Sequence, residues 1–389
     1  MKPSAARVLA ALLASAALAG GGCSSCAGVK GAASDDVAMV PKETAAVVSL
    51  NVTRARDTAL WRKLLDLRDQ AVADGRKADE GHRQDGGAGA DDKNAPPQSY
   101  EEFVSHCGFD PFTQLDSAFL ALPPPPGDGE FALILRGSFN KDKLLACGKA
   151  AAKREGSDLV ETEYAGKKLY NDPSGSTFLS FLDDKTIIVG GREWSKKVLD
   201  LATGKQGAES ARKNDELSAL LKKARTGDAV WGAAVVGESV RQQLRNNERL
   251  AQAGSMKDLV GSLDFTHGLD LQLLVDLGSE GDASGLAQKV SAQIDEAKKS
   301  RQLMVLGLSS LVEAVKAESQ GATFKLSMKL DQRQVDDLVG RAMALFQSAA
   351  PRLGAGLPGG AAPSLPSPGG AGGFQPTFPS AAPRLKLNP

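Results

Sequence analysis

Apolar residues along this chain recur with two periods, one of two residues and one near 3.6, which are typical of strands and of amphipathic helices. In the first part of the chain, the pattern predicts strands and helices in alternation. The strands are expected at Thr44–Leu50, Asp116–Leu122, Glu130–Arg136, Leu159–Tyr164, Lys168–Tyr170, Thr177–Leu182 and Thr186–Val189. The helices are expected after Thr53, at Tyr100–His106, at Lys141–Arg154, and around Trp194, Val198 and Leu201 with a stop at Gly204.

The second part of the chain repeats this alternation. Its strands are expected at Asp228–Val236, Leu259–Thr266, Leu269–Leu277, Leu311–Glu318 and Ala322–Leu330. Its helices are expected at Asp215–Arg225, Glu238–Ala253, Asp282–Leu303 and from Asp331, where Gln334 completes a capping box. Both parts therefore follow the order β-α-β-β-α-β-β-α, with an extra strand pair in the first. This shared order indicates an internal duplication.

The fold class that these elements predict is α+β. In "TFKLSMKL", Thr323–Leu330, large apolar residues alternate with Thr, Lys and Ser, so one face of that strand lies in water. We therefore expect an antiparallel sheet with helices on one face. The first six elements of each half also match the split βαβ arrangement of ferredoxin-like sheets. The segments "FALILRG" and "TFLSFL" are apolar on both faces and are expected to be central strands.

Composition divides the chain into five segments. Residues 1–22 are expected to be a signal peptide and residues 23–39 a flexible tether rich in small residues. The two α+β halves then cover 40–205 and 206–348. The first half contains a charged, glycine-rich insertion at 74–98, which we expect to be disordered because it has almost no large apolar residues. A disordered Pro/Gly-rich tail is expected at 349–389.

The N-terminus carries a positive start and an apolar run, Val8–Ala19, which is too short to span a bilayer. Two cleavage sites compete. Ala17-Leu18-Ala19 suits ordinary signal peptidase and would release a soluble protein. The tripeptide Leu18-Ala19-Gly20 resembles the bacterial lipoprotein signal, although two further glycines precede Cys23. We favour lipidation of Cys23, and Ser24 after it is typical of sorting to the outer membrane. Without lipidation, the protein would be periplasmic or extracellular.

Four cysteines are present. In an oxidising envelope compartment, Cys107 and Cys147 are expected to form a disulfide, the alternative being two buried free thiols. If Cys23 is lipidated, Cys26 is left as an exposed thiol or as a partner for another chain.

The charged and polar residues indicate neither nucleic-acid binding nor catalysis. Lys plus Arg and Asp plus Glu each number 47, so the basic excess of a nucleic-acid binder is missing. The three histidines, His82, His106 and His267, are not spaced as metal ligands. The glycine pair before Trp194 lacks a phosphate-loop fingerprint and is expected to form a tight turn. We therefore predict no catalytic, cofactor or metal site, and place the three tryptophans in the core.

The segment "VPKETAAVVSLNV", Val40–Val52, followed by Trp61, resembles the opening of uncharacterised bacterial envelope lipoproteins. The resemblance implies no activity or site residue. Our first hypothesis is a non-enzymatic envelope lipoprotein, held on the membrane by its lipid and presenting a surface to an envelope protein. The second is a soluble periplasmic module that binds a small or lipidic ligand between its halves. The third is an enzyme of unrecognised class.

Overall fold

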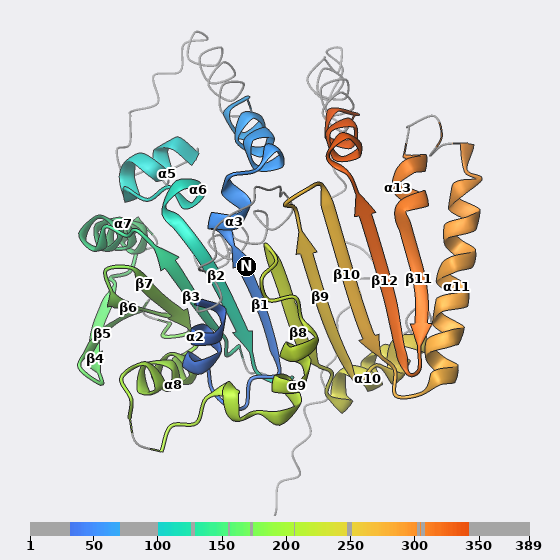
Figure 1. Cartoon of the computed structure of the whole chain (residues 1–389). Coiled ribbons are helices and arrows are strands. Elements are labelled where there is room, and N and C mark those ends of the chain that lie inside the picture. Colours follow the sequence, from blue (N-terminus) through green and yellow to red (C-terminus); the bar gives the residue numbers. More distant parts are fainter. Residues whose placement is uncertain are drawn as a thin grey trace, which may run out of the picture. The chain divides into compact units, whose positions relative to one another are not determined.

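The computed structural model describes residues 32–70, 100–125, 129–154, 156–171, 174–205, 207–246, 251–301, 304 and 308–341. The insertion predicted at 74–98 and the tail predicted at 349–389 lie outside these residues. The described residues build one twelve-stranded sheet, in the order β11-β12-β10-β9-β8-β1-β2-β3-β7-β6-β5-β4 (Figure 1). Every pair of neighbouring strands is antiparallel, so the fold is α+β as predicted.

The first half contributes the strands β1 (Ala46–Asn51), β2 (Leu115–Leu122), β3 (Ala132–Gly137), β4 (Val160–Tyr164), β5 (Lys167–Asn171), β6 (Phe178–Asp183) and β7 (Thr186–Gly190). Its helices are α2 (Ala32–Met39), α3 (Val52–Arg56), α5 (Tyr100–Cys107), α6 (Pro111–Gln114), α7 (Lys141–Arg154) and α8 (Arg192–Ala202). Residues 59–70 are helical as well.

The second half contributes the strands β8 (Val230–Val235), β9 (Asp258–Asp264), β10 (Leu269–Asp276), β11 (Val315–Gln320) and β12 (Thr323–Leu330). Its helices are η2 (Ala211–Lys213), α9 (Asp215–Lys223), α10 (Glu238–Arg245), η3 (Ala251–Ser255), α11 (Glu280–Lys298), α13 (Ser309–Ala314) and the helical residues 332–341.

The two halves share one wiring. In each half, the first three strands lie side by side, a helix (α7 or α11) crosses to the sheet edge, and the chain returns strand by strand to pair with the third strand. The return takes four strands in the first half, β4 to β7, and two in the second, β11 and β12. The first strands of the halves, β1 and β8, pair with each other where the two halves meet. The duplication read from the element order is therefore also present in the topology.

Two parts of the sheet prediction are wrong. The first six elements of each half do not form the predicted ferredoxin-like unit, because its first two strands would have another strand between them, whereas β1 and β2, and likewise β8 and β9, are direct neighbours. The middle two strands of the sheet are β1 and β2; "FALILRG" supplies β3, which pairs with β2, whereas "TFLSFL" supplies β6, third from the edge. Helices cover both faces of the sheet at these strands, so a segment that is apolar on both faces can lie near the edge, as β6 does.

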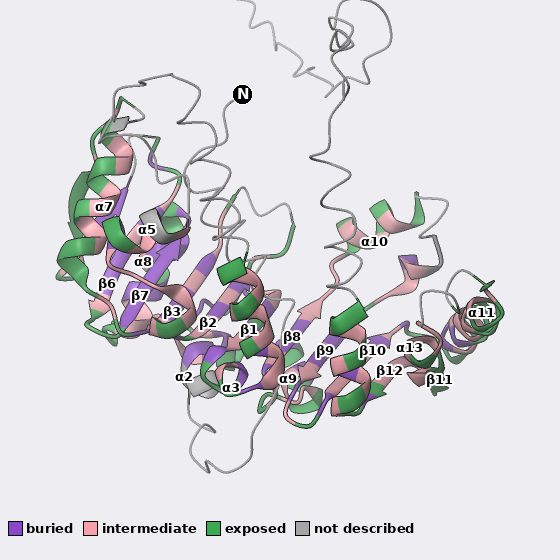
Figure 2. Ribbon diagram, turned by 90° about the horizontal axis from the view of Figure 1, so that it is seen from above, coloured by how far each residue is buried: buried purple, intermediate pink, exposed green. Residues whose placement is uncertain are grey.

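Three apolar clusters hold the helices on the sheet, and Figure 2 shows where the buried residues gather. We call the side that carries α2, α8 and α9 the α8 face. The first cluster lies there and includes Val37, Val47, Phe119, Trp194, Val198, Leu217 and Trp231. We call the opposite side the α7 face. Its second cluster joins α3 and α7 to the first half, and its third cluster joins α11 to the second half. Helices thus cover both faces, not one as expected.

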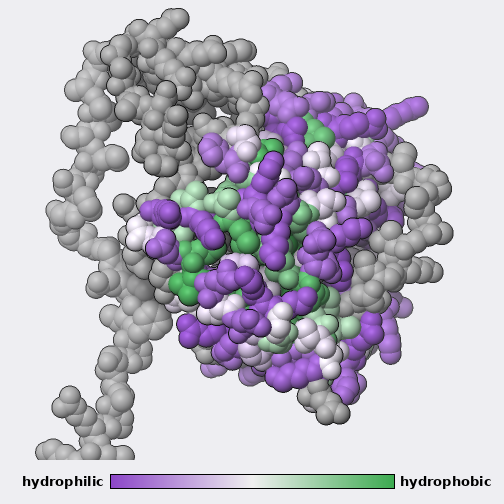
Figure 3. Space-filling view, turned by 90° about the vertical axis from the view of Figure 1, so that its left-hand side faces the viewer, coloured by the Kyte–Doolittle hydropathy of each residue, from purple (hydrophilic) through white to green (hydrophobic). Residues whose placement is uncertain are grey.

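The outermost strands are short and charged. On β4 the sequence is VETEY, and on β11 it is VKAESQ, with most residues exposed. Charged side chains on an edge strand discourage pairing with another chain. Figure 3, which views the molecule from the β4 side, shows polar side chains around smaller apolar areas.

Local capping decides where several helices begin. Asn51, not Thr53, caps α3 by accepting the N–H of Arg54, and Thr58 caps the helical residues that follow by accepting the N–H of Trp61. The predicted capping box is present: Asp331 and Gln334 each accept the backbone N–H of the other at 2.9 Å. The strand expected from Leu311 starts only at Val315, because α13 occupies the preceding residues.

Part of the predicted flexible tether is ordered. Residues 32–39 form α2, and its Val37 packs in the first cluster. Asp36 is buried and accepts hydrogen bonds from Arg136 of β3 at 2.6 and 2.8 Å. The prediction failed because the partner that neutralises this carboxylate lies 100 residues away in the sequence.

Candidate functional site

The two cysteines predicted to pair lie on neighbouring helices. Cys107 ends α5, Cys147 lies in α7, and their Sγ atoms are bonded, with the Cα atoms 4.9 Å apart. The bond fastens α5 to α7, the crossover helix of the first half. Cys23, the predicted lipidation residue, and Cys26 lie outside the described residues.

The remaining candidates for chemistry are scattered. His106 lies in α5 and His267 in the turn between β9 and β10, while His82 is outside the described residues. Within the described part of the chain, no group of three or more His, Cys, Asp or Glu side chains is placed to hold a metal ion. In the same residues, no helix is both long enough and apolar enough to cross a bilayer.

The glycine turn between β7 and α8 is filled by the chain itself. The Glu130 carboxylate accepts the N–H of Trp194 at 2.8 Å and the N–H of Glu193 at 3.3 Å. A Cβ atom on Gly191 would lie 2.4 Å from that carboxylate and only 2.9 Å from the backbone Cα atom of Glu130, so the turn requires glycine. The place at a helix N-terminus where an anion could bind is thus taken by a side chain of the protein.

The most distinctive surface lies on the α7 face between the second and third clusters. We call it the central apolar surface. It consists of Ala46, Val48, Leu120, Leu122, Val230, Gly232, Ala234, Gly261, Leu263 and Leu271, which come from β1, β2, β8, β9 and β10. None of these residues is fully buried, and Val48 and Leu122 are 45% and 37% exposed. Large apolar side chains so exposed in the middle of a sheet make this surface the candidate interaction site.

Strand register places these residues together. Val48 is opposite Leu120 on one side and opposite Gly232 on the other, and Gly232 is opposite Gly261. Cross-strand neighbours on one face have Cβ atoms about 5 Å apart, so the surface is continuous. Because Gly232 and Gly261 have no side chains, the surface is recessed beside Val48. The surface carries no hydrogen-bonding side chain, and its strands are all paired on both sides.

Two contacts frame the central apolar surface, and the duplication relates them. At one end Arg54 of α3, in the first half, reaches the β9–β10 turn of the second. It donates to Asp264 at 2.9 and 3.2 Å and to Thr266 at 2.9 Å. At the other end Ser239 of α10, in the second half, donates to the carbonyl of Pro125 after β2, at 3.2 Å. In each half, the helix that follows the first strand thus contacts the connection between the second and third strands of the other half.

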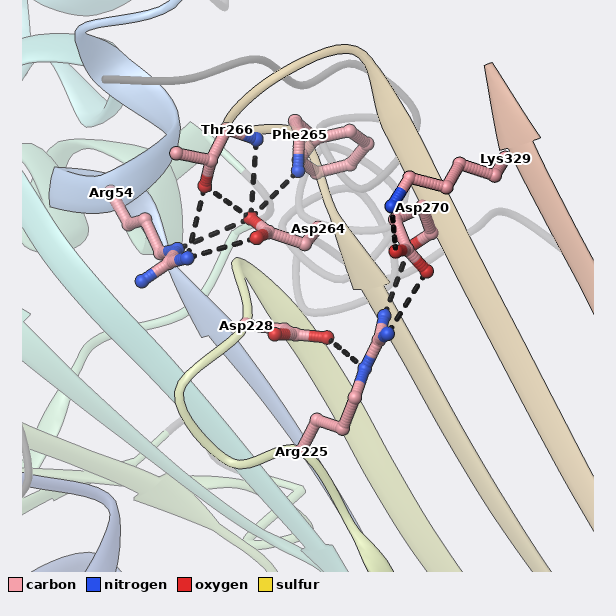
Figure 4. A network of polar contacts seen from close by, with 8 residues as sticks. All are labelled: Arg54, Arg225, Asp228, Asp264, Phe265, Thr266, Asp270 and Lys329. Carbon is pink, nitrogen blue, oxygen red and sulfur yellow. Dashed lines mark hydrogen bonds and ion pairs between the residues drawn. The ribbon is translucent and has the colours of Figure 1, made fainter. Parts of the chain in front are cut away.

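A network of charges continues from the first of these contacts (Figure 4). Arg225, just before β8, lies between two carboxylates, 2.7 Å from Asp228 and 2.9 Å from Asp270. Lys329 of β12 lies 3.7 Å from the other oxygen of Asp270. The network therefore ties the ends of β8, β10 and β12 together.

Two carboxylates in this network respond differently to burial. Burial raises the pKa of Asp228 above its ordinary value, and the nearby Arg225 only partly offsets this. Burial also acts to raise the pKa of Asp264, but the hydrogen bonds from Arg54 and Thr266 outweigh it and lower that pKa. Both carboxylates are held by arginines: Arg54 joins Asp264 across the two halves, whereas Arg225 and Asp228 pair within the second half.

A hollow with a volume of about 750 Å³ lies beside α8 and α9. Its lining is charged, and some of the charges form ion pairs: Lys42 and Lys213 with Glu209, and Lys197 with Glu43.

Comparison with known proteins gives a distant structural likeness only. No protein-family model and no curated protein matches the sequence. Three crystal forms of the protein TP0453 are similar in structure. Form III has a TM-score of 0.40 at 12% identity and covers 78% of this chain and 96% of that one. Form I has 0.37 at 12%, covering 80% and 96%, and form IV has 0.38 at 11%, covering 78% and 94%.

Sequence reasoning found the strands of the central apolar surface but missed the surface. The alternation of Ala46, Val48 and Leu50 with Val47 and Ser49 predicts one buried face for β1. It does not show that the opposite face stays uncovered. The three tryptophans, by contrast, are all buried, as predicted.

Proposed function

We propose that this protein is a non-enzymatic lipoprotein of the bacterial envelope that binds an apolar partner through the central apolar surface. The observation that carries the proposal is the exposure of Val48 and Leu122 between two well-packed clusters. Exposing such residues to water is unfavourable by about 25 cal/mol per Å². A partner that covers them recovers this free energy.

The chemistry of the surface supports recognition without catalysis. Its side chains are aliphatic, and the backbone groups of its strands are used in ladders on both sides. Such a surface offers shape and apolar area but no nucleophile, acid or base. We therefore propose that selection of the partner rests on apolar contact.

The lipid anchor supports a position close to a membrane. If Cys23 is acylated, eight residues separate it from Ala32, where α2 begins. Even a fully extended chain of that length spans only about 30 Å. The folded part would thus stay near the bilayer, and two or more acyl chains would hold it there firmly. By resemblance, Ser24 favours the outer membrane, with the protein facing the periplasm.

A second candidate function uses the same surface. In this alternative the protein is a soluble periplasmic module whose ligand is a small or lipidic molecule. The low, aliphatic floor at Gly232 and Gly261 favours it, because a hydrocarbon chain needs no hydrogen-bonding partner.

Two measurements test these proposals. The first is the intact mass of the protein recovered from its native envelope, beside a Cys23→Ala variant. We expect acyl mass on a chain that begins at Cys23, lost in the variant. An unmodified chain that begins near Gly20 would overturn the lipoprotein proposal and leave the soluble module.

The second measurement places a photo-crosslinking amino acid at Val48, with Val160 as control. Val160 is a similarly exposed valine, 40%, but lies on the edge strand β4. A protein captured from Val48 and not from Val160 would support the first function. Lipid that copurifies with the protein and is lost in Val48→Asp would support the second. Equal capture from both positions, without bound lipid, would refute the proposed surface.

A further inference from the structure

One ion pair joins two helices that leave the same end of the sheet. Lys63 lies in the helical residues 59–70, which follow β1 and α3, and Asp336 lies in the helical residues 332–341, which follow β12. Lys63 Nζ lies 2.7 Å from Asp336 Oδ1, although the residues are 273 positions apart in the sequence. The contact therefore links the first half to the second.

This ion pair spans three strands. Between β1 and β12 lie β8, β9 and β10, so the two strands are about 19 Å apart at a spacing of about 4.8 Å. The two helices must therefore reach toward each other across the ends of these strands. On the α7 face, those ends carry Val230, Leu263 and Leu271 of the central apolar surface.

The first helix lies on the α7 face, because its Trp61, Leu64 and Leu65 pack in the second cluster. Gln332 donates to Asp336 at 3.1 Å and orients its carboxylate. The Lys63 and Asp336 side chains are 32% and 44% exposed, so the pair is only partly shielded from solvent. Ion pairs of this exposure are weak and are screened by salt. The contact can thus open without disturbing the core.

We infer that the Lys63–Asp336 pair is a latch between the two halves that limits entry to the central apolar surface from this end of the sheet. The inference rests on the proposed function, since it regulates the same surface. A partner enters from this end when the ion pair breaks and the Lys63 and Asp336 side chains move apart, while Trp61 stays packed in the second cluster.

The test is the rate at which the apolar dye ANS binds to the full chain, followed by stopped-flow fluorescence. All variants carry Cys23→Ala, so that no attached lipid takes up dye. Lys63→Met removes the charge and keeps the length of the side chain, and Asp336→Asn removes the other charge. Combining Lys63→Glu with Asp336→Lys reverses the pair. Lys298→Met is the matched control, because Lys298 forms an ion pair of 2.9 Å with Asp295 on the exposed side of α11.

We expect Lys63→Met and Asp336→Asn each to speed dye binding by two- to fivefold, fivefold being the effect of about 1 kcal/mol. The reversed pair should restore the original rate, and Lys298→Met should not change it. Added salt should speed binding to the unmodified pair only.

Val48→Asp separates the latch from the surface. If Val48→Asp abolishes dye binding while Lys63→Met binds at the original rate, the latch is refuted and the proposed surface stands. If Val48→Asp binds dye as before, the proposed surface itself is refuted. Urea unfolding midpoints of all variants show whether each one is folded.

Discussion

The two halves share one wiring but differ in how deeply their strands are buried. All five residues of β7 in the first half are buried, whereas only one of the eight residues of β10 in the second half is. The first half has helices on both faces, a disulfide and an extra strand pair, while the polar face of β10 to β12 in the second half is half-exposed. Equal topology therefore does not imply equal stability. We expect the second half to open first.

Of the changes considered, removal of the disulfide should have the largest effect on stability. It should reduce the difference in stability between the first half and the second. The bond closes a loop of 40 residues between Cys107 and Cys147. Chain entropy of that loop predicts a loss of about 4 kcal/mol in the free energy of unfolding for Cys107→Ala with Cys147→Ala. Urea unfolding of the double variant measures it, and reduction of the natural protein is the control. A loss below about 1 kcal/mol would show that the first half does not depend on the bond.

Truncating one apolar residue in each half compares their packing directly. Ile188 of β7 is fully buried, and Leu326 of β12 is half-buried. Ile188→Ala should lower the free energy of unfolding by about 3 kcal/mol and Leu326→Ala by about 1 kcal/mol, because the half-buried Leu326 side chain buries less apolar surface. Hydrogen exchange of each variant reports which half opens. Equal costs would contradict the comparison.

Breaking the contact between the halves should have a smaller effect. Asp264→Asn weakens the paired hydrogen bonds from Arg54, and we expect a loss of about 1 to 2 kcal/mol at pH 7. The pKa of Asp264 is lowered in the folded state, so its contribution is present above the ordinary value of 3.8. It is lost as the pH falls from there through the folded pKa. Urea unfolding between pH 7 and pH 3 should thus be less pH-dependent in the variant, and parallel curves would refute this.

The neighbouring carboxylate should behave in the opposite sense. The pKa of Asp228 is raised by burial, so its charged form weakens folding at neutral pH, and this penalty disappears as the pH falls through the raised pKa. Asp228→Asn should therefore leave stability at pH 7 within about 0.5 kcal/mol of the natural protein, or slightly above it. Thermal unfolding of the two variants side by side measures the contrast. A large loss for Asp228→Asn would show that its pairing with Arg225 outweighs burial.

The sequence alone determined the elements and their order. Alternation in Thr323–Leu330 identified β12, and the pair Asp331 and Gln334 identified the start of the next helix. Both could be predicted because each signal involves only residues that are close together in the sequence. The burial of Trp61, Trp194 and Trp231 was also predictable, since each lies on the apolar side of its element.

Tertiary structure alone decided what each face meets. The order of α2 depends on Arg136, which is distant in sequence from Asp36, and the central apolar surface exists because no described helix from either half packs over Val48. Arg54 and Asp264 are 210 residues apart, and no local pattern connects them. Periodicity reveals which side chains share a face of a strand or helix. Which faces pack together depends on contacts between distant parts of the chain, such as the pairing of β1 with β8, which no local pattern specifies.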